Sequence, residues 1–397
     1  MKSFGPALAW RFKLLLKLPR NIVSAFIRHK YPVRKGLVMC WAYNFRQYGC
    51  NPKALTEYLL EHNDEDFEIC WAFRKGIDTT DIDSRIRCVH HGSLEYIKLA
   101  NTAEFLITNF RTHPYDIFWK KRPGQKYLML WHGGTPLKKI EKDVEEKLGY
   151  QYPLKAKADS KACDLMISGC RLHTRLVNEK FWYDGEVLEK GLPRSDIFFN
   201  KSRHAAIRES VCQRYGIRKD SFILLYAPTF RKPVTIEPYR LDWNAVIEEL
   251  RTTFSTKDVT VLLRLHPNLI GKCDTSSLLN SPEVKDATMY PDMQELLCAS
   301  DMLITDYSSS MFDMMMLGRP CILYAKDKEK YDRGYYFELD KLPFPLTVSE
   351  NELIEHIRNF NLDRYLEECK QFDSEFVGSV ERGEACSELV NWMKTHR

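Results

Sequence analysis

The sequence MLITDYSSSMFDMMMLGRP, residues 302–320, decides the fold class of this chain. Its first residues form an apolar run that is typical of a short buried strand, and the run stops at Asp306. Ser308 and the two serines that follow it open a run of helix formers that ends at Gly318, with Pro320 beyond it. The order is a strand, a hydroxyl-rich turn and then the start of a helix. The first backbone N–H groups of that helix have no partner within it, which favours a bound phosphate. Because Asp306 and Ser308 are also ordinary capping residues, the stretch alone is typical of a well-capped core helix as well.

Apolar strands alternate with helices along the rest of the chain. Strands are predicted at 36–43, 67–73, 85–89, 105–108, 127–130, 165–168, 187–190, 222–226, 259–265, 302–305 and 321–324. Helices are predicted from Asn51 onward and at 94–99, 203–215, 293–298, 352–366 and 385–393. This alternation predicts an α/β protein of two doubly wound, Rossmann-like domains that face a cleft.

The length of 397 residues allows two domains, each with its own core. We expect a basic amphipathic segment at 1–35, α/β domains at 36–192 and 193–370, and a C-terminal helical segment at 371–397 that packs back on the first domain. A content of 44% hydrophobic and 28% charged residues is typical of a soluble globular protein. The twelve cysteines form no C-x-x-C pair, which favours reduced thiols in a cytoplasmic protein.

The net charge of +5 is unevenly distributed, because eleven Lys and Arg precede the first acidic residue, Glu57. A basic excess confined to one end argues against a nucleic-acid cleft. Apolar residues at helical spacing lie among these cations: Leu8, Phe12, Leu15, Leu16, Ile22, Val23, Phe26 and Ile27. Such a segment is suited to an anionic membrane surface, although Pro19 interrupts it and an apolar stripe often packs on a core instead. The sequence has no apolar run long enough to span a membrane and no secretory signal.

Polar residues directly follow four predicted strands: His132, Thr229 with Arg231, His266, and Asp306 with Ser308. Since ligands of doubly wound sheets bind outside the carboxyl ends of the strands, we expect these groups to meet in the cleft. Two linked phosphates need cations, hydroxyls and backbone N–H groups, and the candidates are Arg194, Arg231, Arg264, Ser308 and Ser309. His266, if protonated, would neutralise a leaving phosphate, but a histidine before Pro267 also commonly caps a turn.

His132 lies between Trp131 and two glycines, which leave room for a substrate hydroxyl to reach the imidazole. A base there would suit transfer to an alcohol, and the alternative is a tight turn in which the histidine fills space. The sequence contains neither G-x-x-x-x-G-K-[ST] nor a G-x-G-x-x-G after a strand. The sequence does not support a metal site, because its carboxylates do not cluster. The pair Asp306 and Asp313 is the one combination that the sequence leaves open as metal ligands.

Five motifs occur in a characteristic order: WHGGTPLKK (131–139), GLPRSD (191–196), APTFR (227–231), LRLHPN (263–268) and TDYSSSMFD (305–313), followed by RGYYF (333–337) and LP (342–343). From about Val38 to Pro345 the chain resembles the CDP-glycerol glycerophosphotransferases, the teichoic-acid primases and polymerases and related capsule polymer transferases. The resemblance implies a GT-B-like fold and transfer of glycerol phosphate, or a polyol phosphate such as ribitol phosphate, from a CDP-linked donor with release of CMP.

The resemblance also implies roles for individual residues. His132 takes the place of the base and His266 that of the group that stabilises charge on the diphosphate. Substrate-binding positions are then Gly133, Gly134, Thr135, Arg194, Pro228, Thr229, Arg231, Arg264, Asp306, Tyr307, Ser308, Ser309 and Asp313. The first domain would hold the acceptor and the base, and the second would hold CDP-glycerol or CDP-ribitol. The acceptor would be a polyprenyl-diphosphate-linked or glycan hydroxyl at the cytoplasmic membrane face. No cofactor is implied beyond this co-substrate.

Two departures from the family pattern bear on specificity. Gly134 is an extra glycine beside the expected base, and Phe344 stands where the family often has glycine, so both would reshape the acceptor or polyol pocket. The chain lacks the large N-terminal region of the long polymerases, which favours a primase or small polymer transferase. The alternatives are a GT-B glycosyltransferase that uses a nucleotide sugar and a non-catalytic nucleotide- or lipid-binding protein of the same shape.

Overall fold

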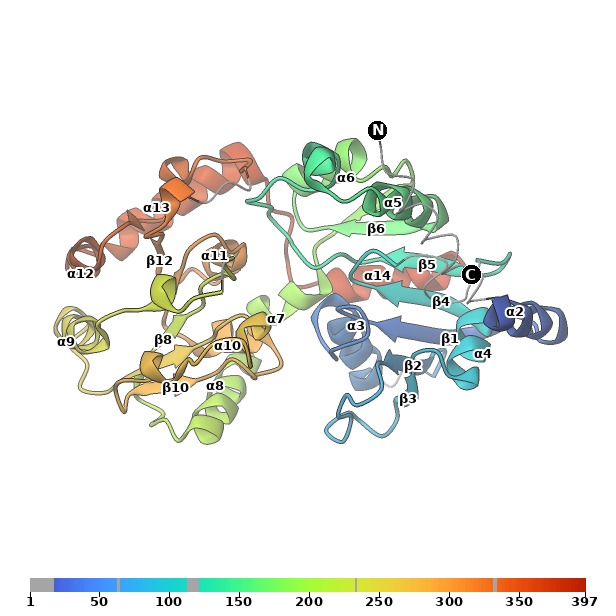
Figure 1. Ribbon diagram of the computed structural model, residues 1–397, viewed down its shortest axis with the longest axis horizontal. Helices are drawn as coiled ribbons and strands as arrows, with labels where there is room; N and C mark the ends of the chain where they lie inside the picture. Colours follow the sequence, from blue (N-terminus) through green and yellow to red (C-terminus); the bar gives the residue numbers. More distant parts are fainter. Residues whose placement is uncertain (1–17, 63–64, 113–120, 233, 331–333) are drawn as a thin grey trace.

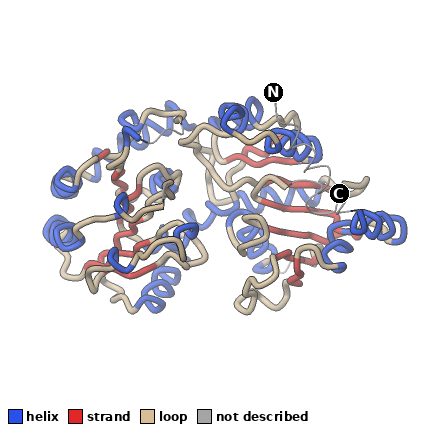
Figure 2. Tube along the Cα trace, viewed as in Figure 1, coloured by secondary structure: helices blue, strands red, loops and turns tan. Residues whose placement is uncertain are grey.

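The computed structural model describes residues 18–62, 65–112, 121–232, 234–330 and 334–397. The apolar positions predicted before residue 18, and Arg333 of the RGYYF motif, lie outside these ranges. The described chain forms two lobes, each built on a parallel sheet with helices outside it (Figures 1 and 2). The predicted α/β, GT-B-like architecture is therefore confirmed.

The first sheet has seven parallel strands in the order β3-β2-β1-β4-β5-β6-β7. They are β1 (Arg34–Trp41), β2 (Glu68–Phe73), β3 (Arg87–His90), β4 (Ala103–Thr108), β5 (Lys126–Met129), β6 (Leu165–Ser168) and β7 (Glu186–Glu189). The strand order reverses between β1 and β4, and this switch point is where doubly wound sheets bind ligands. The helices of this lobe are α2 (Leu18–Lys30), α3 (Cys50–Glu61), α4 (Leu94–Thr102), α5 (Gln151–Ala162) and α6 (Arg171–Lys180).

The second sheet has six parallel strands in the order β10-β9-β8-β11-β12-β13. They are β8 (Phe222–Tyr226), β9 (Val259–Leu263), β10 (Val284–Asp286), β11 (Met302–Thr305), β12 (Cys321–Tyr324) and β13 (Leu346–Thr347). The switch point of this sheet lies between β8 and β11. Its helices are α7 (Asp196–Phe199), α8 (Lys201–Tyr215), α9 (Trp243–Thr253), α10 (Met293–Ala299), α11 (Ser310–Met316), α12 (Glu350–Arg358) and α13 (Leu362–Phe372).

The last helix, α14 (Ala385–Thr395), returns to the first lobe. Its Leu389 and Met393 are fully buried and share a core cluster with strands of the first sheet. The Trp392 indole Nε1 donates to a Glu186 carboxylate oxygen at 2.9 Å. The chain therefore crosses between the lobes twice, once before α7 and once before α14 (Figure 1).

The amphipathic stretch 352–366 was predicted as one helix, and that prediction is wrong. α12 ends at Arg358 and α13 begins at Leu362, because the Asn361 side chain accepts a hydrogen bond from the Arg364 amide and caps a new helix. Pro19 stands in the first turn of α2 as the structure describes it, a position where a proline is tolerated, and the predicted interruption involves residues before 18, which lie outside the described ranges. Strands β10 and β13, of 3 and 2 residues, were not predicted because so short a run carries no periodic signal.

All twelve cysteines lie in described residues and all are unpaired. None of the helices described here has the length and apolar character needed to cross a bilayer.

Candidate active site

His132 follows β5 and lies close to the switch point of the first sheet. Its Nδ1 lies 2.9 Å from the Asn109 carbonyl oxygen, which follows β4. Because a carbonyl oxygen only accepts, Nδ1 carries the proton and the lone pair is on Nε2. Among the described residues no hydrogen bond to Nε2 is found, and the side chain reaches solvent. Surrounding protein lowers the pKa of His132, the bond to Asn109 opposes this, and the nearby Arg194 cation lowers the pKa further. His132 is thus a neutral imidazole that presents a basic nitrogen.

The backbone around His132 is held by two buried asparagines. The Asn109 side-chain oxygen accepts from the Tyr43 amide at 2.9 Å, which joins the ends of β4 and β1 across the switch point. The Asn51 amide nitrogen donates to the carbonyl oxygens of Leu130 and Trp131, at 2.7 and 3.1 Å. Since Trp131 has a φ of +48°, the chain turns sharply there, and these bonds fix the turn.

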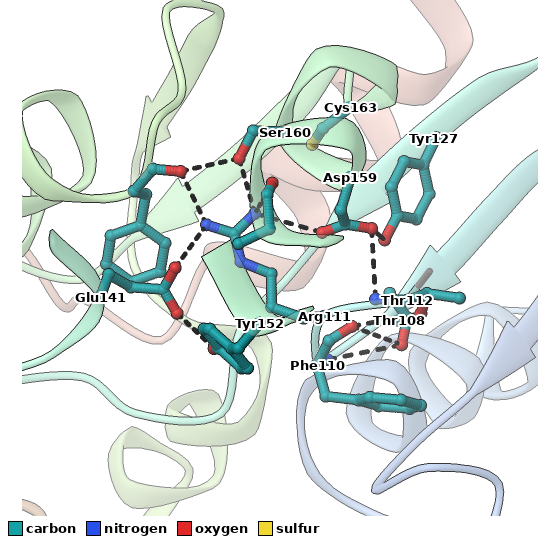
Figure 3. A network of polar contacts seen from close by, with 12 residues as sticks. Thr108, Phe110, Arg111, Thr112, Tyr127, Glu141, Tyr152, Asp159, Ser160 and Cys163 are labelled. Carbon is teal, nitrogen blue, oxygen red and sulfur yellow. Dashed lines mark hydrogen bonds and ion pairs between the residues drawn. The ribbon is translucent and has the colours of Figure 1, made fainter. Parts of the chain in front are cut away.

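A buried polar network surrounds Arg111, close in the chain to Asn109 (Figure 3). Arg111, two residues after Asn109, pairs with Glu141 at 3.0 Å and with Asp159 at 3.1 Å, and no more than 7% of any of these side chains is exposed. Asp159 also accepts from the Thr112 amide at 3.2 Å. Burial raises the pKa of Asp159 to about 6, although Arg111 opposes the shift. The network therefore connects two segments: the turn at Asn109, whose carbonyl bonds His132, and Glu141 at the end of the 131–141 loop.

Two predicted donor-binding residues meet across the switch point of the second sheet. The Thr229 amide donates to both oxygens of Asp306, at 2.9 and 3.0 Å. Arg231 contacts the same carboxylate, and its Nε and Nη2 pair with the two oxygens of Asp327 at 3.0 and 3.1 Å. The Tyr307 hydroxyl donates to Asp327 at 2.9 Å. Arg231 and Asp306 are 7% and 1% exposed, so in this structure they hold the loop after β8.

Arg264 and two serines are better placed to meet a phosphate. Arg264 has one nitrogen, Nη1, bonded to the Tyr290 carbonyl, and no carboxylate lies within ion-pair distance of it among the described residues. Burial lowers the pKa of Arg264, which ordinarily lies so high that the side chain stays cationic. Ser308 and Ser309 are partly exposed just before α11. The Ser308 hydroxyl accepts from the Ser310 amide at 3.3 Å.

His266 presents the opposite tautomer from His132. Its Nδ1 accepts from the Asn268 amide at 3.1 Å, so a neutral ring carries its proton on Nε2. Burial lowers the pKa of His266, and the Lys138 and Arg264 cations lower it further. Protonation of the ring, the condition set by the sequence analysis, is therefore disfavoured, and His266 offers a neutral N–H donor. Lys138 belongs to the loop after His132, so this cation comes from the other lobe.

Several contacts join the lobes around these groups. Arg194 Nη2 pairs with Asp313 at 2.9 Å, and the two side chains are 9% and 5% exposed. The Lys139 amide donates to the Gly334 carbonyl at 3.1 Å, and the Tyr336 amide donates to the Leu137 carbonyl at 2.8 Å. The run 334–337, from the RGYYF motif, thus pairs with the loop that follows His132.

The structure explains only one of the two departures from the family pattern. A side chain on Gly134 would lie 3.2 Å from Leu192 and 3.9 Å from Arg194 Nη2, so glycine permits the loop to pack on the segment between the lobes. Phe344, by contrast, is 3% exposed and packs against Phe312 at a ring distance of 5.7 Å. Phe344 therefore belongs to a core rather than to a pocket wall.

A carboxyl group lies beside the same segment. Glu381 accepts from the Leu192 amide at 3.2 and 3.1 Å, and side chains on Gly169 or Gly191 would overlap it. Burial raises the pKa of Glu381 to about 8, although the Leu192 amide and the Arg194 cation oppose the shift.

Sequence reasoning missed three groups that shape the site: Asn51, Asn109 and Asp327. Asn51 was predicted only as the start of a helix, and Asn109 and Asp327 follow strands without a motif around them. For Asn109 and Asp327, the position shortly after a strand was the available signal. Among the described residues no group of three or more His, Cys, Asp or Glu side chains is arranged to hold a metal ion.

Comparison with known proteins decides the family. The family model for CDP-Glycerol:Poly(glycerophosphate) glycerophosphotransferase matches residues 23–393. The chain belongs to this family. It is therefore a transferase, and the predicted resemblance is confirmed.

The matches to individual relatives differ in how much of the chain they cover. The teichoic acid glycerol-phosphate transferase of Staphylococcus aureus (strain NCTC 8325 / PS 47) is 32% identical over 95% of this chain and 94% of its own. The teichoic acid ribitol-phosphate primase of Bacillus spizizenii (strain ATCC 23059 / NRRL B-14472 / W23) is 31% identical over 44% of each chain. Among solved structures, the wall teichoic acid polymerase TagF is 25% identical with a TM-score of 0.81, covering 99% of this chain and 98% of that one.

Proposed function

We propose that the enzyme transfers glycerol phosphate from CDP-glycerol to a hydroxyl of a lipid-linked or glycan acceptor and releases CMP. The observation that carries this proposal is the pair of opposite tautomers: His132 offers a free basic nitrogen and His266 offers an N–H donor. A proton acceptor for an attacking alcohol and a donor for a charged diphosphate are the two groups that such a transfer needs. The first lobe would hold the acceptor and the second the donor.

The proposed step has one bond formed and one broken at phosphorus. The acceptor oxygen attacks the phosphorus that carries glycerol, and its proton passes to His132 Nε2. The bond from that phosphorus to the bridging oxygen breaks, and this oxygen leaves with CMP. The Nε2–H of His266, the Arg264 cation and the amides of Ser308 and Ser309 would stabilise the charge that develops on the diphosphate.

Glycerol is the preferred polyol for this proposal. The relatives matched over their full length are a glycerol-phosphate transferase and a poly(glycerol phosphate) polymerase, whereas the ribitol-phosphate primase matches over less than half. TagF has been solved after soaking with CDPG. These relatives favour CDP-glycerol over a nucleotide sugar as donor.

We propose that the enzyme acts at the cytoplasmic face of an anionic membrane. The described part of its basic N-terminal segment, α2, exposes Ile22 and Phe26 by 63% and 60%. These side chains are four residues apart and so share a helix face, beside the cations Arg28 and Lys30 in the last turn. An exposed apolar pair flanked by cations is suited to the interface of an anionic bilayer.

The test is product analysis with a panel of donors. Purified enzyme is incubated with CDP-glycerol, CDP-ribitol or a UDP-sugar, each with and without a lipid-linked acceptor. We expect acceptor-dependent CMP release that is fastest with CDP-glycerol. Release of a nucleoside diphosphate from the sugar donor, with no CMP from either CDP-polyol, would show that the enzyme is a glycosyltransferase.

A further inference from the structure

Asn51 joins the loop of His132 to the segment between the lobes. Its side-chain nitrogen donates to the Leu130 and Trp131 carbonyls, and its side-chain oxygen accepts from the Arg194 amide at 3.0 Å. The side chain is 0% exposed. An asparagine amide carries two donors and an acceptor in one plane, so all three contacts depend on one rigid group. A rotation of Arg194 relative to the loop would break at least one of them.

Arg194 carries the connection into the second lobe. Its Nη2 pairs with Asp313 Oδ1 at 2.9 Å, and the other Asp313 oxygen accepts from the Gln294 side chain at 3.4 Å. Asp313 lies on α11, the helix that directly follows Ser308 and Ser309. Because both charged side chains are at least nine-tenths buried, the pair is held in a fixed geometry, with little room for a ligand phosphate at Nη2.

A second ion pair joins the lobes without touching the loop. Lys53 Nζ, on α3, pairs with Asp292 at 2.7 Å and with Glu295 at 3.0 Å at the start of α10. This pair contributes to adhesion between the lobes, as the Arg194 pair does. Only the Arg194 pair leads through Asn51 to the backbone directly before His132.

We propose that Asn51, Arg194 and Asp313 are positioning residues that set the distance between the His132 base and the donor-binding turn before α11. This inference rests on the proposed function and reassigns Arg194 and Asp313 from donor binding to alignment. Alignment matters because attack on phosphorus requires the base, the hydroxyl and the phosphorus in line, and a misplacement of about 1 Å costs roughly 100-fold in rate. A residue that only aligns the two sites acts on the rate of transfer and leaves donor affinity unchanged.

The first test compares Asn51→Asp with Lys53→Met as the matched control. Asn51→Asp keeps an oxygen for the Arg194 amide but sets a carboxylate against the carbonyls of Leu130 and Trp131. We expect its kcat for CMP release to fall about 100-fold, with the Kd for CDP-glycerol within about twofold of wild type. Lys53→Met leaves Asp292 and Glu295 without their cation and is therefore expected to lower stability, but to keep kcat of the folded enzyme within about threefold, because Lys53 does not contact the loop of His132.

The second test replaces the buried pair as a unit, since a single replacement would leave an unpaired charge. The variant Arg194→Met/Asp313→Leu is expected to bind CDP-glycerol as the wild type does and to lose kcat. The Arg194 cation lowers the pKa of His132, so its removal should raise that pKa. The acid limb of kcat/KM should then shift to higher pH. A purely structural role would lower the melting temperature and leave kcat of the folded enzyme close to that of the wild type.

The outcomes separate the inference from the function on which it rests. If wild-type enzyme releases no CMP from CDP-glycerol, the proposed function fails. If wild type is active and the double variant binds CDP-glycerol at least tenfold more weakly, Arg194 contacts the donor and the inference is overturned. It is also overturned if both the Asn51 and the pair variants keep kcat within threefold of wild type, or if Lys53→Met loses as much as they do.

Discussion

Because His132 and His266 have opposite tautomers, we predict that they respond differently to the same pair of replacements. The perturbation is replacement of each histidine by asparagine and by glutamine. An asparagine nitrogen takes the place of Nδ1 and can still donate to the Asn109 carbonyl, whereas a glutamine nitrogen takes the place of Nε2. Neither amide accepts a proton near neutral pH. At His132, which is to act through a basic Nε2, both variants should therefore lose activity to a similar extent.

The expected loss at His132 follows from the role of the base. A positioned general base contributes about 10²–10⁴-fold, so kcat should fall by that factor, which equals about 3–5 kcal/mol of transition-state stabilisation. The Kd for CDP-glycerol should stay within about twofold, because His132 is expected to meet the acceptor. In the wild type the acid limb of kcat/KM should lie below pH 6.5, since the surrounding protein and the Arg194 cation lower the pKa of His132 and the base acts unprotonated.

His266 should respond differently to the same two replacements. His266→Asn keeps an acceptor for the Asn268 amide and loses the Nε2–H, so kcat should fall about 10²–10³-fold. His266→Gln restores an N–H near the position of Nε2 and should recover at least tenfold of that loss. The assay is CMP release at saturating donor. Equal activity of the two His266 variants, or a His132 variant within tenfold of wild type, would refute the assigned roles.

Three further predictions concern stability and membrane contact. Because burial raises the pKa of Glu381 to about 8 in the folded protein, its contribution to stability is present below pH 4.5 and is lost as pH rises through 8. Glu381→Gln should therefore gain stability relative to wild type between pH 5 and pH 9 in urea unfolding, and a constant difference would contradict the assigned burial. Arg111→Met leaves two buried carboxylates unpaired and should cost about 3–5 kcal/mol in urea unfolding; a loss below about 1 kcal/mol would show that the network is solvated. Phe26→Asp should weaken sedimentation with vesicles containing phosphatidylserine by roughly tenfold or more, and unchanged binding would place the contact elsewhere.

The sheets were predictable because each core strand is an apolar run bounded by a polar residue. The run before Asp306 became β11 and the run before His266 became most of β9, both inside the second sheet, although Asp306 itself is buried against Thr229 and Arg231. Parallel topology brings the carboxyl ends of all strands to one edge. Helix ends were less predictable, since the cap at Asn361 divides an amphipathic pattern that continues across it.

The partners of the arginines were not predictable from the motifs. Arg231 pairs with Asp327, 96 residues later, and Arg194 with Asp313, 119 residues later. A motif shows that an arginine is near the site, but only the fold shows whether that arginine is already paired with a carboxylate. For this reason Arg264, which has no such partner among the described residues, is the arginine we assign to the diphosphate.

The central claim is that the diphosphate lies between His132 and His266, which follow β5 and β9, the strands next to the switch points of the two sheets. The most direct measurement is a crystal structure of the His132→Asn variant with CDP-glycerol bound. We predict that a diphosphate oxygen lies within hydrogen-bond distance of His266 Nε2 and of the Ser308 or Ser309 amide, with glycerol directed toward residue 132. The account would be contradicted if the diphosphate instead occupied the polar cavity of about 580 Å³ lined by Lys53 and Arg203, on the α3 side of the junction.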